Sequence, residues 1–243
     1  MKRLWLLREW VRFIVQVLRG GERRSSALLM RRRPPGLFQP YGTTQEDRYP
    51  EVFHSIRQVV ADVEQTHILS FGCSTGEEVF TLARYFRYAH IRGLDIDAGR
   101  IGRCWARWQC EGREPRLSFA CAGNVALEKT ASYDLVLAMA VFRHGALGGS
   151  PVDCSSWIRF ADFDRLLSDL VRVLKPGGLL VIRHANFRFG DTGVAGQFEC
   201  LRGEPGQGSP VYGTDNRLLP GVSGDDGIYR KRSAPPTSSH MAR

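Results

Sequence analysis

The chain has 243 residues, and 43% of them are hydrophobic, which is enough to bury the core of one α/β domain. Its net charge is +9, and almost all of its basic residues are arginine. The basic residues gather near both ends of the chain without alternating with aromatic residues, and this argues against nucleic acid as a partner. The six cysteines lack the spacing of a metal site, so we expect no metal and reduced thiols in a cytoplasmic protein.

Residues 1–20 predict an amphipathic helix, because apolar residues recur at steps of three and four. These residues are Leu4, Leu7, Val11, Ile14 and Leu18. Charged residues interrupt the run, which excludes a membrane-spanning helix and the core of a secretion signal. The helix could dock on the protein's own body or on another subunit, lie on an anionic membrane surface, or serve as a targeting sequence. The sequence leaves the oligomeric state open.

A basic linker is expected over residues 21–36, since a glycine pair and two prolines interrupt regular structure there. The folded domain is expected over residues 37–232. Residues 233–243 contain little apolar surface and predict a disordered tail.

Within the domain, strand patterns alternate with helix patterns, which predicts a doubly wound, Rossmann-like and mostly parallel sheet. A first helix is expected from Asp47, with Phe53, Ile56, Val59, Val60 and Val63 on one face. The expected strands cover residues 68–71, 91–95, 117–121, 133–139 and 179–183, and the later helices cover residues 98–110 and 160–174.

Residues 67–80 carry the strongest functional signal in the chain. Ile68, Leu69 and Phe71 suit a buried strand, while Gly72 and Gly76 let the backbone approach a ligand closely. The segment Phe-Gly-Cys-Ser-Thr-Gly-Glu-Glu at residues 71–78 resembles the first motif of class I S-adenosylmethionine-dependent methyltransferases, in the form found in chemotaxis-receptor methyltransferases. The wider resemblance extends over roughly residues 50 to 190. It implies S-adenosyl-L-methionine as the cofactor, and it implies that short strands at residues 198–202 and 228–231 close a seven-stranded sheet as an antiparallel hairpin.

Ligands of doubly wound sheets bind beyond the carboxyl ends of the strands. Asp95 ends the second strand 19 positions after Gly76, close to the spacing of about 20 expected for an acid that binds ribose hydroxyls. A helix cap is the alternative role, for which Asp97 is better placed. By resemblance, Asn124 meets the adenine edge, although an ordinary turn asparagine explains it too. The predicted cofactor-binding residues are Phe71, Gly72, Cys73, Ser74, Gly76, Asp95, Ile96, Asn124, Val125, Met139 and Ala140.

Two other nucleotide-binding classes fit the glycine turn poorly. The turn lacks the three-glycine spacing that lets a backbone approach a dinucleotide pyrophosphate. No Gly-Lys-Ser/Thr sequence follows it, which argues against a phosphate-binding loop.

The sequence therefore predicts methyl transfer to an unidentified acceptor, such as a small molecule or a glycan or lipid precursor. His144 and His184 follow the fourth and fifth strands, where either could act as a base or as a structural donor. Residues 38–49 are expected to form a lid, and Arg143, Arg183, Asn186 and Arg188 would favour an anionic or sugar-like acceptor, unless these arginines are simply solvated. A cofactor-binding scaffold without turnover is one alternative. A protein carboxyl methyltransferase is another, although the helical domain that precedes receptor methyltransferases is not evident.

Overall fold

The computed structural model describes residues 2–206 and 208–233. The predicted tail lies outside these residues from position 234 onward. The described strands are β1 (His67–Phe71), β2 (His90–Asp95), β3 (Leu117–Cys121), β4 (Tyr133–Met139), β5 (Leu174–Arg183), β6 (Phe198–Pro205) and β7 (Asp225–Lys231). The described α-helices are α1 (Lys2–Leu18), α2 (Gly21–Arg32), α3 (Pro50–Arg57), α4 (Glu77–Tyr85), α5 (Ala98–Cys110) and α6 (Phe160–Val173).

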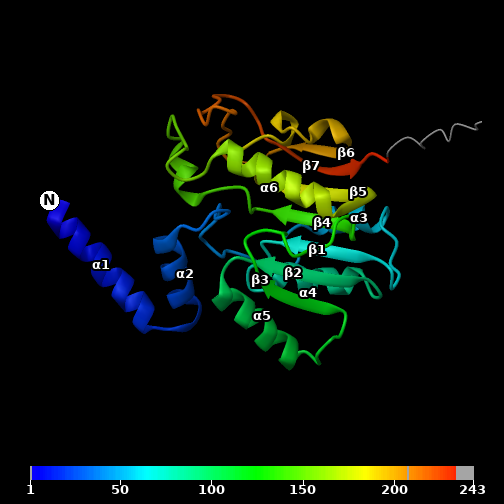
Figure 1. Cartoon of the computed structure of the whole chain (residues 1–243), viewed down its shortest axis with the longest axis horizontal. Helices are drawn as coiled ribbons and strands as arrows, with labels where there is room; N and C mark the ends of the chain where they lie inside the picture. The colour runs from blue at the N-terminus through cyan, green and yellow to red at the C-terminus, as the bar shows by residue number, and fades with distance from the viewer. Residues whose placement is uncertain (1, 207, 234–243) are drawn as a thin grey trace, which may run out of the picture.

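These strands form one sheet in the order β3-β2-β1-β4-β5-β7-β6 (Figure 1). The first five strands in the chain pair in parallel, whereas β7 pairs antiparallel with both β5 and β6. Strand order reverses between β1 and β4, because β2 and β3 extend the sheet on one side and β5 extends it on the other. The predicted doubly wound sheet with its closing hairpin is confirmed.

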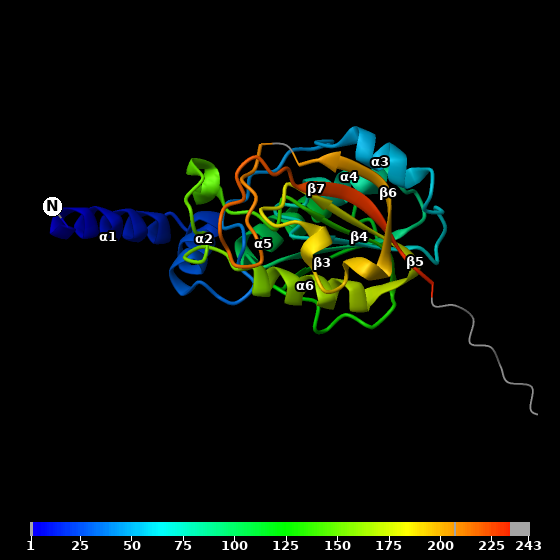
Figure 2. The same ribbon diagram turned by 90° about the horizontal axis from the view of Figure 1, so that it is seen from above.

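The sheet is buried on both faces, as expected for parallel strands connected by helices. Successive β1 residues point to opposite sides, so that Ile68 packs with α3, α4 and α5 while Leu69 packs with α6. Figure 2 shows α3 and α4 on one face and α6 on the other. Because α6 buries residues at steps of three and four, its apolar face packs against β4 and β5.

Two expected segments differ in the structure. The helix that begins near Pro50 ends at Arg57, and Val59 and Val63 are exposed, so the expected apolar face is shorter. The Asp62 carboxylate accepts hydrogen bonds from the backbone N–H groups of residues 87–89, which fixes the chain in a loop there. Residues 21–32, expected as part of a basic linker, form helix α2 because no proline occurs before Pro34.

Helices α1 and α2 form a hairpin at one end of the molecule, with α1 extending away from the sheet in both views (Figures 1 and 2). Helix α2 docks on the start of α5: the Ser26 hydroxyl donates to an Asp97 carboxylate oxygen at 2.6 Å, and the Gly99 N–H donates to the Ser25 hydroxyl at 3.1 Å. The Arg31 guanidinium lies 4.5 Å from the centre of the Trp10 ring and joins the two helices. No helix among the described residues has the length and apolar character needed to cross a membrane.

Candidate functional site

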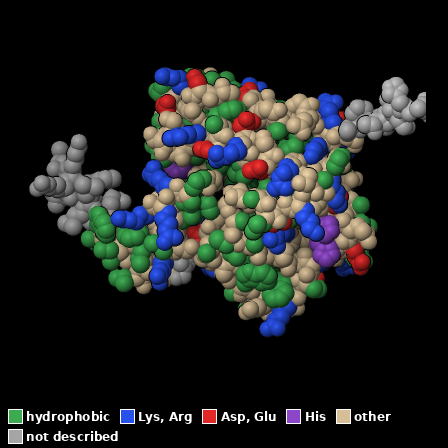
Figure 3. All heavy atoms as spheres, in the orientation of Figure 1, with side chains coloured by type: hydrophobic (Ala, Val, Ile, Leu, Met, Phe, Trp, Pro, Cys, Tyr) green, Lys and Arg blue, Asp and Glu red, His purple; other side chains and the backbone are tan. Residues whose placement is uncertain are grey.

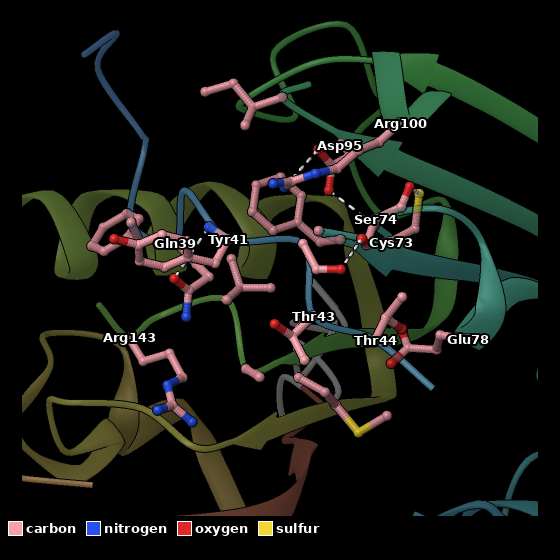
Figure 4. Close-up of a pocket in the computed structure, with 18 of the residues that line it drawn as sticks. Gln39, Tyr41, Thr43, Thr44, Cys73, Ser74, Glu78, Asp95, Arg100 and Arg143 are labelled. Carbon is pink, nitrogen blue, oxygen red and sulfur yellow. Dashed lines mark hydrogen bonds and ion pairs between the residues drawn. The ribbon is translucent and has the colours of Figure 1, made fainter. Parts of the chain in front are cut away.

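A cavity of about 330 Å³ opens at the carboxyl ends of β1, β2 and β4, where strand order reverses (Figure 4). Its size falls within the range of small-molecule and cofactor sites. One wall comes from the strand ends, and the opposite wall comes from residues 36–49, which we call the strap. The predicted lid residues 38–49 are part of this strap.

The turn after β1 forms the floor of the cavity. Gly72 has a φ of +77°, and the backbone N–H groups of Gly72 and Cys73 both donate to the carbonyl oxygen of Leu94 on β2. A Cβ atom on Gly72 would lie 2.4 Å from the Val141 side chain, so no larger residue fits without a shift. Ser74, Ala140 and His184 follow β1, β4 and β5 with a positive φ. Such backbone strain in residues other than glycine concentrates at functional sites.

Asp95 ends β2 with its carboxylate at the cavity wall. One oxygen accepts a hydrogen bond from the Ser74 N–H at 2.9 Å, and the other accepts one from the Asp97 N–H at 2.8 Å. The Arg100 guanidinium lies 3.7 Å away. Burial raises the pKa of Asp95, while the charge of Arg100 opposes this rise. A carboxylate has about four acceptor positions, so a hydroxyl group in the cavity can still donate to it. Asp97 caps α5, as expected for the alternative role in this segment.

Glu78 is a functional candidate that the sequence analysis missed. Its side chain lines the cavity and accepts a hydrogen bond from the Ser70 hydroxyl at 2.7 Å. Burial raises the pKa of Glu78 to about 7. Figure 4 shows Glu78 beside Thr44, apart from Asp95. A cationic group bound in this part of the cavity would favour the ionised carboxylate. The sequence contained a sign of this role, because Glu78 is the second glutamate of the 71–78 segment. It was missed because acidic residues are common in the first turn of a helix.

Three contacts hold the strap over the strand ends. The Ser74 hydroxyl donates to the carbonyl oxygen of Gly42 at 3.1 Å, and the Arg100 guanidinium donates to that of Pro40 at 2.6 Å. Farther along, the Asp47 N–H donates to the Thr81 hydroxyl at 3.1 Å. The strap is therefore attached to the turn after β1 and to helices α4 and α5, which line the cavity on its other side.

Most of the predicted cofactor-binding residues line this cavity. They are Phe71, Gly72, Cys73, Ser74, Asp95, Ile96, Met139 and Ala140. Gly76 instead begins α4 with a φ of +97° and packs against Phe80. Val125 is fully buried in the core beneath α6. Asn124 is exposed and accepts a hydrogen bond from the Ala126 N–H, while Ala122 and Gly123 line the cavity in its place.

Cys73 has no sign of nucleophilic activation. Its thiol is buried next to Cys104, and this neighbour together with burial raises the pKa of the Cys73 thiol well above its usual value. Since the thiolate is the reactive form, the small size of the side chain explains Cys73 at this position.

The two predicted histidines lie outside the wall of the main cavity. His144 lines a second cavity of about 350 Å³ on the other side of strap residues 36–41, and its Nδ1 atom accepts a hydrogen bond from the Ala146 N–H. His184 packs its ring against Tyr49, with 5.6 Å between the ring centres. Burial lowers the pKa of both imidazoles, which favours their neutral forms.

The four polar residues that were predicted to favour an anionic or sugar-like acceptor differ in their surroundings. Arg143 lines the main cavity. Arg183 is buried and pairs with Glu204 at 2.6 Å. Asn186 serves the fold, since its side chain accepts from the His144 N–H and donates to the Pro210 carbonyl oxygen. Arg188 lies 3.9 Å from Asp191 in an ion pair.

Comparison with known proteins identifies a family profile described as a methyltransferase domain, which matches residues 69–182. Trans-aconitate 2-methyltransferase of Deinococcus radiodurans is 26% identical over 171 residues, covering 68% of this chain and 57% of that protein. Fatty-acid O-methyltransferase of Mycolicibacterium smegmatis is 29% identical over 140 residues, covering 57% of this chain and 44% of that protein. The chain spans about half the length of these relatives.

Among solved structures, the [4+2]-cyclase SpnF matches with a TM-score of 0.47 at 20% identity. The match covers 64% of this chain and 58% of that one.

Proposed function

Since residues 69–182 form a class I S-adenosylmethionine-dependent methyltransferase domain, we propose that the chain transfers a methyl group from S-adenosyl-L-methionine to a small molecule or to a glycan or lipid precursor. The observation that carries this proposal is the buried carboxylate of Asp95 beside a glycine turn, at the reversal point of a doubly wound sheet. The named acceptors of two relatives, trans-aconitate and a fatty acid, are both small acids and support a small-molecule acceptor.

The groups around the cavity match the cofactor chemically. Asp95 would accept hydrogen bonds from the sugar hydroxyls, and Ile96, Ala122 and Gly123 would contact the base. Glu78 would bind the amino group, because an ammonium ion offsets the cost of ionising this buried carboxyl group. When bound, the cofactor supplies a methyl group that its sulfonium already activates for transfer. The chain's own residues then have to orient the acceptor and exclude water, and the strap covers the cavity for the second task.

Titration calorimetry with S-adenosylmethionine and S-adenosylhomocysteine tests the cofactor assignment. The unaltered chain should bind both compounds, and Asp95→Asn should weaken both by at least about tenfold, since hydrogen bonds to a charged group contribute about 1.5–3 kcal/mol. Asp153→Asn is the matched control, because Asp153 is an exposed carboxylate that accepts from Ser155 away from the cavity. A chain that binds neither compound would refute the methyltransferase proposal.

Turnover separates an enzyme from a binding protein with the same fold. Release of S-adenosylhomocysteine in the presence of small acids, lipids or glycans is the expected result. Cofactor binding without release for any acceptor would favour the scaffold alternative, and release only with protein substrates would favour a protein carboxyl methyltransferase.

We also propose that the protein is cytoplasmic and that its α1–α2 hairpin contacts an anionic membrane surface. The described part of α1 exposes large apolar side chains, with Trp10 50% and Leu18 80% accessible. Basic side chains lie next to hydrophobic ones on this hairpin (Figure 3). This combination suits a helix that lies in the interface between lipid headgroups and water. The six free cysteines are consistent with a reducing compartment.

Vesicle co-sedimentation tests this contact. Deleting residues 1–20 should abolish the partitioning onto vesicles that contain anionic phosphatidylglycerol, without changing the affinity for S-adenosylhomocysteine. Neutral phosphatidylcholine vesicles serve as the control for the charge contribution. Equal partitioning of the full and shortened chains would refute membrane contact. Unfolding of the shortened chain would instead show that the helix docks on the protein itself.

A further inference from the structure

Several buried polar atoms of the described residues have no hydrogen-bond partner. Two of them belong to residues that line the main cavity, and a third belongs to His184, whose ring packs against Tyr49 outside that lining. They are the Tyr49 hydroxyl, Arg143 Nε and His184 Nδ1. Tyr49 and Arg143 both line the cavity, the Tyr49 and His184 rings lie 5.6 Å apart, and the charge of Arg143 acts on His184. An unsatisfied buried polar group costs about 1–3 kcal/mol, so the Tyr49 and Arg143 atoms would be stabilised by a hydrogen-bond acceptor in the cavity.

The three groups share a preference for a hydrogen-bond acceptor. Tyr49 is only 8% exposed, and burial raises the pKa of its hydroxyl, which therefore keeps its proton. The guanidinium of Arg143 is a donor only. Burial lowers the pKa of His184, and a neutral imidazole donates from Nδ1 in one of its tautomers. A ligand with two acceptor oxygens and a negative charge would satisfy Tyr49 and Arg143.

Groups of both signs act on Tyr49, namely the cations Arg48 and Arg183 and the acids Glu78 and Asp226. Arg48 lies over the Tyr49 ring and donates to the Thr43 carbonyl oxygen, and Arg183 is paired with Glu204. The Nε atom of Arg143 has no hydrogen-bond partner among the residues that the structure describes. The nearby Asp226 carboxylate already accepts a hydrogen bond from the backbone N–H of His184. The guanidinium of Arg143 is therefore available to a bound carboxylate, which suits its planar donor geometry.

We propose that Arg143 and Tyr49 hold the carboxylate of the methyl acceptor, with His184 packed behind Tyr49, so that the acceptor is a carboxylic acid and the product is its methyl ester. This inference rests on the proposed methyl transfer. The position of Arg143 favours the acceptor over the cofactor's own carboxylate as the bound anion. Figure 4 shows Arg143 on the opposite side of the cavity from Glu78 and well away from Asp95, the two acids assigned to the cofactor.

Carboxylate methylation also needs no general base. One carboxylate oxygen forms a bond to the methyl carbon while the carbon–sulfur bond of the donor breaks, and its electron pair returns to sulfur. An anion and a sulfonium thereby become a neutral ester and a neutral thioether. No proton moves, so neither histidine has to act as a base. Arg143 orients the anion, and the Tyr49 hydroxyl donates to its second oxygen.

Binding measurements on the full chain saturated with S-adenosylhomocysteine test the proposal, with trans-aconitate, dodecanoate and a panel of linear mono- and dicarboxylates as probes. At least one probe should bind and be methylated. Arg143→Gln should weaken that probe by at least about tenfold, as expected for charged hydrogen bonds, while the affinity for S-adenosylhomocysteine stays within about twofold. Arg230→Gln, at a surface pair with Glu199 on the β6–β7 hairpin, is the matched control and should change neither affinity.

Tyr49→Phe provides a second test that does not depend on the fold of the Arg143 variant. Removing an unsatisfied buried hydroxyl should raise the melting temperature of the free protein, whereas probe binding should weaken several-fold because one hydrogen bond is lost.

Four results would overturn the carboxylate site. They are unchanged probe binding in Arg143→Gln, equal weakening of probe and S-adenosylhomocysteine in that variant, unchanged probe binding in Tyr49→Phe, and no binding by any carboxylate while neutral acceptors are methylated. The second result would assign Arg143 to the cofactor's carboxylate. Failure of the unaltered chain to bind S-adenosylhomocysteine would instead refute the proposed function.

Discussion

Replacing Glu78 by glutamine should change how the stability of the protein depends on pH. Burial raises the pKa of Glu78 from 4.5 to about 7 in the native state. The native state therefore keeps this proton at pH values where the unfolded chain has lost it, and the free energy of unfolding falls as pH rises from about 4.5 to about 7. The difference between the two pKa values corresponds to about 3 kcal/mol. Glutamine keeps an acceptor for the Ser70 hydroxyl but does not titrate, so it removes this decline.

Urea unfolding of both proteins at a series of pH values measures the effect. The free energy of unfolding of Glu78→Gln minus that of the unaltered chain should grow by about 3 kcal/mol between pH 4.5 and 7.5, and should stay constant above that. Glu204→Gln is a control of opposite sign, because Arg183 lowers the pKa of Glu204 and the corresponding difference should shrink as pH rises through the acidic range. Parallel pH profiles for Glu78→Gln and the unaltered chain would refute the assignment of a raised pKa.

Two further substitutions test the glycine turn and the cap of α5. Gly72→Ala should destabilise the fold by about 1–2 kcal/mol through its φ of +77°, and by more through overlap with Val141. Adding Val141→Ala to this variant should recover only the stability lost through the overlap. A urea midpoint of either variant as high as that of the unaltered chain would contradict this account. Asp97→Ala should cost about 0.5–2 kcal/mol by removing the cap of α5, and the contact with Ser26 on α2 adds to that loss. An unchanged urea midpoint for Asp97→Ala would show that the cap contributes little.

The fold could be predicted because burial and local pattern agree along most of the domain. The helix over residues 98–110 has the same bounds in sequence and structure, since Asp97 caps its start and its apolar residues face one side. Strand runs such as residues 133–139 are apolar on both faces, which is typical of a central parallel strand. The ends of elements were harder to predict, because the loop after α3 is fixed by Asp62, whose partners lie 25 to 27 residues farther along the chain.

The candidate site could be predicted where a residue type is tied to a backbone position. Gly72 and Asp95 follow from the turn and the strand end that require them. Glu78 and Tyr49 could not be found in this way, because their surroundings are built by elements distant in sequence. Burial turns an ordinary helix-start glutamate into a group that ionises near neutral pH, and it leaves the hydroxyl of Tyr49 without a partner.

The strap that closes the cavity is also the segment that continues from the α1–α2 hairpin. The contacts with Ser74, Arg100 and Thr81 hold the strap over the cavity, and we expect them to break when a bound nucleoside leaves. The strap follows α2, which is hydrogen-bonded to the start of α5, so the N-terminal end of the strap is fixed while the rest of it moves. We therefore expect strap opening to limit release of the used donor, and we expect the proposed membrane contact of the hairpin to change the rate of that opening.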